Sequence, residues 1–150
     1  MTKVLAFLCL LSLVACSSPQ KITTKPLNEP LNAITAAING AMSMGIQSLS
    51  ENHRTAFSRP FLVKQSDEAM KKGFRERGRA KVTILGDERP YTLEVEVVIE
   101  RGKVIKGQTD ANYTFERYDK RLANRLLKDI FNGLHQALRE RNVIDDFQPF

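Results

Sequence analysis

The chain has 150 residues, of which 42% are hydrophobic and 27% are charged, and its formal net charge at pH 7 is +6. This composition is typical of a globular protein and excludes a fibrous or an intrinsically disordered chain. The length predicts one domain that can bury roughly two thirds of its unfolded surface. Cys9 and Cys16 are the two cysteines, so a disulfide framework or a cysteine-based zinc site in the body of the protein is excluded.

The first fifteen residues have the pattern of an export signal. Lys3 supplies a positive charge, and an uncharged, almost wholly apolar run of eleven residues follows, from Val4 to Val14. A helix of that length spans only about half of the ~30 Å hydrocarbon core of a membrane, so it is too short for a permanent anchor. We expect residues 1–15 to be a signal peptide that is removed.

The apolar run closes with Leu13-Val14-Ala15-Cys16, which resembles the lipobox of bacterial lipoprotein precursors. The resemblance implies that Cys16 receives a thioether-linked diacylglycerol and, after cleavage, an N-acyl chain such as palmitate. Two or three acyl chains give a stable anchor, because each buried CH₂ contributes about 0.8 kcal/mol. Ser17 in the next position implies transfer to the periplasmic face of the outer membrane. The alternative is an ordinary cleaved signal with an incidental cysteine.

Residues 16–30 are expected to form the lipidated cysteine and a flexible tether, and residues 31–150 a single periplasmic domain. The tether contains three prolines among small and polar residues, and proline limits a continuous helix. Residues 31–49 carry apolar side chains at spacings of three and four, which predicts an amphipathic helix. The polar side of this helix carries no charge, which has two interpretations. Either another subunit or lipid covers that side, or the helix is an ordinary core helix that packs on the sheet.

Strands are predicted in the middle of the chain. Residues 55–64 suit an edge or bulged strand because they contain Pro60, and Ser66 can cap a short helix that ends at Gly73. Residues 79–85 and 91–101 alternate apolar and polar side chains, and a turn of Gly, Asp and Pro residues separates them, which predicts an antiparallel hairpin. Residues 112–117 alternate in the same way and predict a last strand.

A long amphipathic helix is predicted over residues 119–141, where leucines and isoleucines recur on one face. The elements together predict an α+β fold, a small antiparallel sheet of three to four strands covered by an N-terminal and a long C-terminal helix. This order of elements is similar to that of small periplasmic domains of outer-membrane lipoproteins, including the plug lipoprotein of the lipopolysaccharide-transport channel. The similarity is one of element order and transfers no residue role.

Residue types that carry catalysis are sparse. His53 and His135 lie in different predicted elements without metal-ligand spacing, and Asp145-Asp146 is a carboxylate pair typical of a surface. Motifs for a serine nucleophile or a phosphate loop are absent from the sequence, and the one cysteine of the mature chain is the predicted lipidation site. We expect a protein that is not an enzyme and that has no metal and no cofactor beyond its acyl chains.

Positive charge is concentrated in residues 64–81, where seven basic residues stand against three acidic ones, a net charge of +4. This predicted basic patch consists of Lys64, Lys71, Lys72, Arg75, Arg77, Arg79 and Lys81. It can attract anionic lipid, glycan or an acidic protein, or it can be a solvated loop. Nucleic acid is disfavoured because the protein is expected to be exported.

Two functions follow as hypotheses. The first is a non-enzymatic assembly or scaffolding partner of an envelope protein complex, which contacts its partner through the basic patch. The alternative is a binding module for an anionic envelope polymer or lipid, such as lipopolysaccharide, peptidoglycan or phospholipid headgroups. An envelope hydrolase is a third, weaker hypothesis, because a site for it is not visible in the sequence.

Overall fold

The computed structural model describes residues 20–103 and 112–146, and of residues 141–146 only the backbone. The strands are β1 (Ile22–Thr23), β2 (Ile46–Leu49), β3 (Thr55–Ser58), β4 (Phe61–Leu62), β5 (Phe74–Leu85), β6 (Thr92–Lys103) and β7 (Tyr113–Tyr118), and the helices are α1 (Leu31–Ala41), α2 (Asp67–Lys71) and α3 (Lys120–Asp146). The predicted signal peptide and Cys16 lie outside the described residues.

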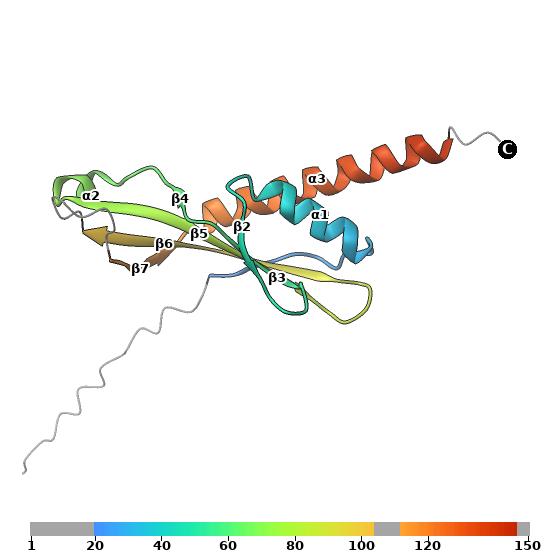
Figure 1. The fold of residues 1–150 in the computed structure, drawn as a ribbon, viewed down its shortest axis with the longest axis horizontal. Helices are drawn as coiled ribbons and strands as arrows, with labels where there is room; N and C mark the ends of the chain where they lie inside the picture. Colours follow the sequence, from blue (N-terminus) through green and yellow to red (C-terminus); the bar gives the residue numbers. More distant parts are fainter. Residues whose placement is uncertain (1–19, 104–111, 147–150) are drawn as a thin grey trace, which may run out of the picture.

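The described strands form one antiparallel sheet with the order β1-β6-β5-β3-β2, to which β4 adds by pairing with β5 and β7 by pairing with β6. Helices α1 and α3 pack on each other and on one face of this sheet, here called the inner face (Figure 1). The opposite face, called the outer face, carries neither α1 nor α3.

The predicted fold class was wrong in the size of the sheet. The structure has a seven-stranded sheet in the described part of the chain, in place of three to four strands covered by two helices. The hairpin is also longer than predicted, since β5 begins at Phe74 and β6 ends at Lys103. Its extra residues include Glu76 and Gly78 at inner-face positions, and neither fits a pattern of apolar alternation.

The predicted helix over residues 31–49 was wrong in its second half. Helix α1 ends at Ala41, and Gly45 adopts a left-handed conformation with φ of 84°. That conformation suits glycine and reverses the chain, so that Ile46–Leu49 pairs with β3 as the edge strand β2. Residues of β2 continue the spacing of the helix stripe by coincidence, and a four-residue strand is too short for its own period to be seen.

Several local predictions are confirmed. The chain breaks at Arg59-Pro60 between β3 and β4, as proline at an edge requires. Ser66 caps α2 by accepting a hydrogen bond from the backbone nitrogen of Ala69 at 3.2 Å, and Gly73 follows the helix with φ of 70°. The hairpin of β5 and β6 is antiparallel over its whole length.

The core lies between the inner face and the two long helices. Val82, Leu93 and Val95 are fully buried on β5 and β6, and Ile34 of α1 and Ile130 of α3 are fully buried on the other side. Each fully buried aliphatic side chain contributes roughly 1.5–3 kcal/mol. The long hairpin and the two helices therefore hold one another in place.

The described part of the predicted tether lies on the sheet. Ile22 pairs with Val95, the backbone nitrogen of Thr24 donates to the carbonyl of Leu93 at 3.0 Å, and Leu27 bridges to Tyr91. Leu27 is buried in the core. The chain is therefore fixed to β6 from residue 22 onward.

Helices α1 and α3 approach closely where Gly133 faces Ala37. A Cβ atom built at Gly133 meets the Cα, Cβ and carbonyl oxygen of Ala37 at 3.8 Å, which is ordinary van der Waals contact. Alanine therefore fits at this position, and a longer side chain does not.

We predict that Gly133→Ala raises the free energy of unfolding by about 0.5–1 kcal/mol, because glycine weakens a helix interior relative to alanine. Urea unfolding followed by circular dichroism measures the change. Gly40→Ala in α1, where a Cβ meets nothing within 4 Å, isolates helix propensity alone. Gly133→Leu lowers stability by pushing the helices apart, and an increase would contradict the described contact.

Candidate functional site

The sheet divides the predicted basic patch. Arg77, Arg79 and Lys81 alternate along β5 on the outer face, whereas Lys71 and Lys72 lie at the end of α2 and Lys64 lies in the loop after β4. Arg75 also belongs to the outer side of β5, at its exposed end. These seven residues therefore do not form one surface.

Carboxylates of β6 neutralise much of the outer-face charge. Glu100 accepts from the Nε of Arg77 at 2.7 Å and lies 3.5 Å from Nη1 of Arg79. Arg79 also donates to the side chain of Gln47 at 2.9 Å. In the sheet register Lys81 stands opposite Glu96. Anion attraction by this face is weakened accordingly, because each cation has a nearby negative charge.

An aromatic cluster lies beside these ion pairs on the outer face. The guanidinium of Arg77 stacks over the ring of Tyr113 with its carbon 3.8 Å from the ring centroid. Phe115 and Tyr118 pack with centroids 4.9 Å apart, and Phe115 is 52% exposed. We call Arg77, Tyr113, Phe115 and Tyr118 the outer aromatic cluster.

A buried carboxylate organises the opposite side of the same strands. The Oε1 atom of Glu76 accepts from Nη2 of Arg101 at 2.8 Å and from Nη1 of Arg117 at 3.0 Å. Gln65 clamps the backbone of Glu76, with its amide donating to the carbonyl and its oxygen accepting from the backbone nitrogen, both at 2.8 Å. The network joins β5, β6, β7 and the loop before α2.

The two guanidinium groups control the ionisation of Glu76. Hydrogen bonds from Arg117 lower the pKa most, burial opposes them, and the hydrogen bonds from Arg101 lower the pKa further, from 4.5 to about 2. Glu76 is therefore charged at any physiological pH. Its carboxylate also fixes Arg117, which reaches the pocket described next.

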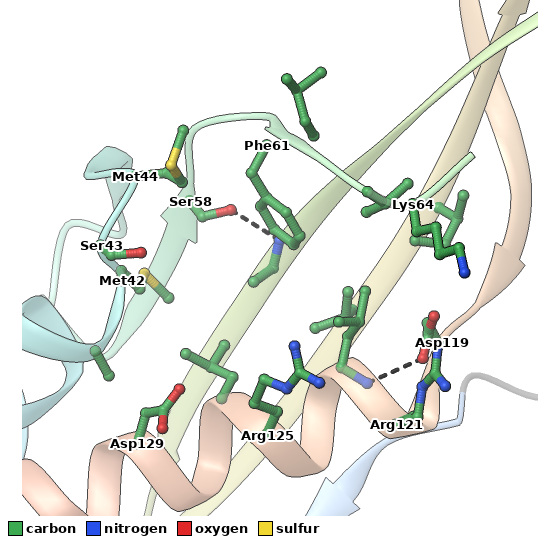
Figure 2. A pocket seen from close by; sticks show the side chains of 18 of the residues that line it. Met42, Ser43, Met44, Ser58, Phe61, Lys64, Asp119, Arg121, Arg125 and Asp129 are labelled. Carbon is green, nitrogen blue, oxygen red and sulfur yellow. Dashed lines mark hydrogen bonds between the residues drawn. The ribbon is translucent and has the colours of Figure 1, made fainter.

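A groove of about 800 Å³ opens on the inner face (Figure 2). Its apolar floor is made by Ala80, Val97 and Ile99 of the sheet, and apolar side chains of the walls, Met42, Phe61, Leu122 and Leu126, surround this floor. The walls come from the chain after α1, from the segment around β4 and from the first half of α3. Met44, 54% exposed, also lines it, and Leu62, 88% exposed, lies at its rim with its side chain on the outer face, opposite Arg77. Large apolar side chains are therefore in contact with water around this groove.

Cations lie on two opposite sides of the groove, with Lys64 on the side of β4 and the arginines on the side of α3 (Figure 2). Arg117, Arg121, Arg125 and Lys64 line the groove together with the carboxylates Asp119 and Asp129. Asp119 caps α3 by accepting from the backbone nitrogen of Leu122 at 2.9 Å. Among the described residues, no carboxylate forms an ion pair with Arg121, Arg125 or Lys64. Figure 2 shows Arg125 extending from α3 toward Phe61.

Sequence reasoning missed this site except for Lys64. Arg117, Arg121 and Arg125 recur every four residues, which is the spacing of one helix face, and α3 begins within this series. This four-residue spacing of arginines could have predicted, from the sequence, a basic stripe beside the apolar face of the helix. The apolar lining of the groove could not be predicted, because its residues come from β4, β5, β6, α3 and the chain after α1, which are distant in the sequence.

Phe61 forms a wall of the groove by lying on Gly78 of β5. A Cβ atom at residue 78 would overlap the Phe61 ring, so glycine is what permits this contact. The hydroxyl of Ser58 accepts from the backbone nitrogen of Ala80 at 2.9 Å, and this buried polar atom is engaged. The floor beside Phe61 is consequently apolar in character.

The remaining candidate residues are scattered. His53 lies exposed in a loop with φ of 55°, and His135 lies exposed on α3, its ring centroid 6.5 Å from that of Phe131. Asp145 and Asp146 end α3, where only the backbone is described. The described residues contain no group of three His, Cys, Asp or Glu side chains suited to a metal ion. In the same part of the chain, no helix is long and apolar enough to cross a membrane.

Comparison of the chain with protein-family models, with curated proteins and with solved structures gives no match.

Acid is expected to destabilise the fold through Glu76. Because the folded pKa is depressed to about 2 from 4.5, the unfolded chain binds a proton that the folded chain does not between these values. The contribution is therefore fully present above pH 4.5 and is lost as the pH falls toward 2, by about 3 kcal/mol in all. Urea unfolding as a function of pH measures this slope.

Glu76→Gln is expected to remove that slope and to lower stability at pH 7 by about 3 kcal/mol, since Arg117 loses its carboxylate partner and Arg101 keeps only Glu116. Glu88→Gln, in the exposed turn between β5 and β6, is the matched control and changes stability by less than about 0.5 kcal/mol. An unchanged acid profile in the Glu76 variant would contradict the described network.

Proposed function

We propose that this protein is a non-enzymatic lipoprotein of the bacterial envelope, anchored through Cys16 to the periplasmic face of the outer membrane, whose domain binds an anionic envelope lipid or polymer. The lipobox resemblance of Leu13-Val14-Ala15-Cys16 supports the anchor. The inner-face groove supports the binding function, because it combines an apolar floor with cations that lack carboxylate partners among the described residues.

The groove carries this proposal better than the predicted basic patch does. On the outer face Arg77 and Arg79 already share Glu100, so an incoming anion must compete with an existing ion pair. Arg121 and Arg125 stand one helical turn apart on exposed positions of α3 and line a concave surface. A concave site with few polar groups is the usual form of a ligand pocket.

Charge reversal on the groove tests this function. The chain carrying Cys16→Ala, which removes the predicted lipidation site, is mixed with phosphatidylglycerol vesicles, with lipopolysaccharide and with peptidoglycan fragments. Arg121→Glu combined with Arg125→Glu is expected to weaken binding to the anionic ligand by at least about tenfold. Binding of the unchanged groove should also fall steeply between about 0.05 and 0.2 M salt, because exposed charges are screened.

The matched control is Lys71→Glu combined with Arg75→Glu. It makes the same change in net charge at exposed positions away from the groove lining. If the two double variants lose the same amount of affinity for the anionic ligand, binding depends on net charge and the groove is not the binding site. Absence of binding to all three anionic ligands would refute the binding function itself.

The outer aromatic cluster favours a second candidate function, an assembly or scaffolding partner of an envelope complex. Arginine and tyrosine are enriched at protein interfaces, and large aromatic groups there contribute strongly to affinity. Phe115 presents an exposed ring next to the Arg77–Tyr113 stack.

For the assembly function we expect crosslinking of the anchored protein in its native envelope to recover one or two envelope proteins in stoichiometric amounts. Phe115→Ser should abolish their recovery, whereas Leu85→Ser, an exposed apolar residue at the other end of β5, should not. Recovery that is unchanged by Phe115→Ser would exclude this surface as the contact.

A further inference from the structure

We propose that the inner-face groove binds one single-chain amphiphile, with its acyl chain on the apolar floor and its anionic head at Arg121 and Arg125. This inference rests on the proposed binding function and narrows the ligand from any anionic envelope lipid or polymer to one lipid chain with one charged head. The juxtaposition of floor and cations in one concavity carries it.

The floor fits a hydrocarbon chain and offers little to a glycan or a peptide. Val97 and Ile99 of β6 are buried at its base, and Leu122 and Leu126 of α3 form one side. The hydroxyl oxygen of Ser58 already accepts a hydrogen bond from the backbone nitrogen of Ala80. A polymer with many hydroxyl and amide groups would leave those groups without partners over such a floor, which is costly.

The head-group position follows from the cations. Arg121 and Arg125 are one turn apart on α3, and each guanidinium offers a planar fork that matches a carboxylate or a phosphate. Lys64 adds a third positive charge from the opposite wall. Asp119 at the start of α3 and Asp129 one turn after Arg125 flank the two arginines, so the positive charge is centred on Arg121 and Arg125.

The volume of the groove is sufficient for one acyl chain. The groove holds about 800 Å³, within the range of about 300–1,000 Å³ that is usual for small-molecule sites. The exposed apolar side chain of Met44 belongs to the same lining, where a bound chain would remove it from water.

A substitution at Gly78 can narrow the groove without changing its cationic residues. Because the Phe61 ring lies on Gly78, a methyl group at residue 78 must displace the ring away from β5, toward the space that the groove occupies. The displaced atoms are the far end of one side chain, and Gly78 does not have a positive φ, so the strand itself accommodates alanine.

The test is a displacement titration. The chain carrying Cys16→Ala is titrated with an anthroyloxy-labelled stearate, whose fluorescence rises in an apolar site, and the label is then displaced by four competitors. Palmitate and hexadecyl phosphate have a chain and a charge, hexadecanol has the chain alone, and inorganic phosphate has the charge alone. We expect saturation at one probe per chain and displacement by the first two competitors at concentrations at least about tenfold lower than by hexadecanol, with no displacement by inorganic phosphate.

Two variants assign the binding to the groove. Gly78→Ala is expected to weaken probe binding at least about tenfold through Phe61, and Arg121→Gln combined with Arg125→Gln is expected to bring the affinity for palmitate down to that for hexadecanol. The outer-face variant Leu85→Ser, at an exposed position in no proposed site, is the control and leaves both affinities unchanged. Far-ultraviolet circular dichroism checks each fold, and the arginine variant, at exposed positions, serves if Gly78→Ala does not fold.

The outcomes separate this inference from the function on which it rests. Displacement by inorganic phosphate, equal displacement by hexadecanol and palmitate, or probe binding that neither groove variant changes would overturn the inference. If the labelled stearate does not bind while anionic vesicles or polymers still bind through Arg121 and Arg125, the inference fails and the proposed function stands. If the anionic vesicles and polymers fail to bind as well, both fail.

Discussion

Burial of the inner face of the β5–β6 hairpin is the constraint on which the rest of the structure depends. The hairpin is twelve residues long on each strand, and its buried aliphatic side chains point to one face, so that face must be covered. Helix α3 is long enough to cross it, but α1 has only eleven residues and ends at Ala41. The part that α1 does not reach is bordered by the chain after α1, by the segment around β4 and by the first half of α3, and the groove lies there.

At that end of the hairpin the sheet changes from apolar to ionic. Ile99 is followed on the inner face by Arg101, and Ala80 is preceded by Gly78 and Glu76. A buried carboxylate is tolerated there because two guanidinium groups and the Gln65 side chain satisfy it and its backbone. The network thus aligns β7 with β6 and sets the start of α3, from which the groove arginines extend.

The sequence was sufficient to predict those elements that have a clear hydrophobic periodicity or a recognisable capping residue. The hairpin alternation, the Ser66 cap, the proline break and the long C-terminal helix are all readable within a window of a few residues. The extent of the sheet was not readable, because β1 has two residues, β2 has four, and both are strands only by virtue of their neighbours. The binding site could not be predicted for the same reason, because it depends on neighbours that are distant in the sequence. Charge density along the chain favoured residues 64–81, but cross-strand ion pairs with residues such as Glu100 decide which basic side chains can still bind an anion.

The attachment of the N-terminal segment to β6 has a geometric consequence. Ile22 is already paired with Val95, so only six residue steps separate the proposed lipid on Cys16 from the sheet. A fully extended chain of that length reaches about 20 Å, which is about half the length of the 27-residue helix α3 at about 1.5 Å per residue. If Cys16 carries the proposed lipid, the domain stays next to the bilayer surface, where the local concentration of lipid is high. Under the proposed lipid binding, such a concentration keeps the groove occupied even with modest intrinsic affinity.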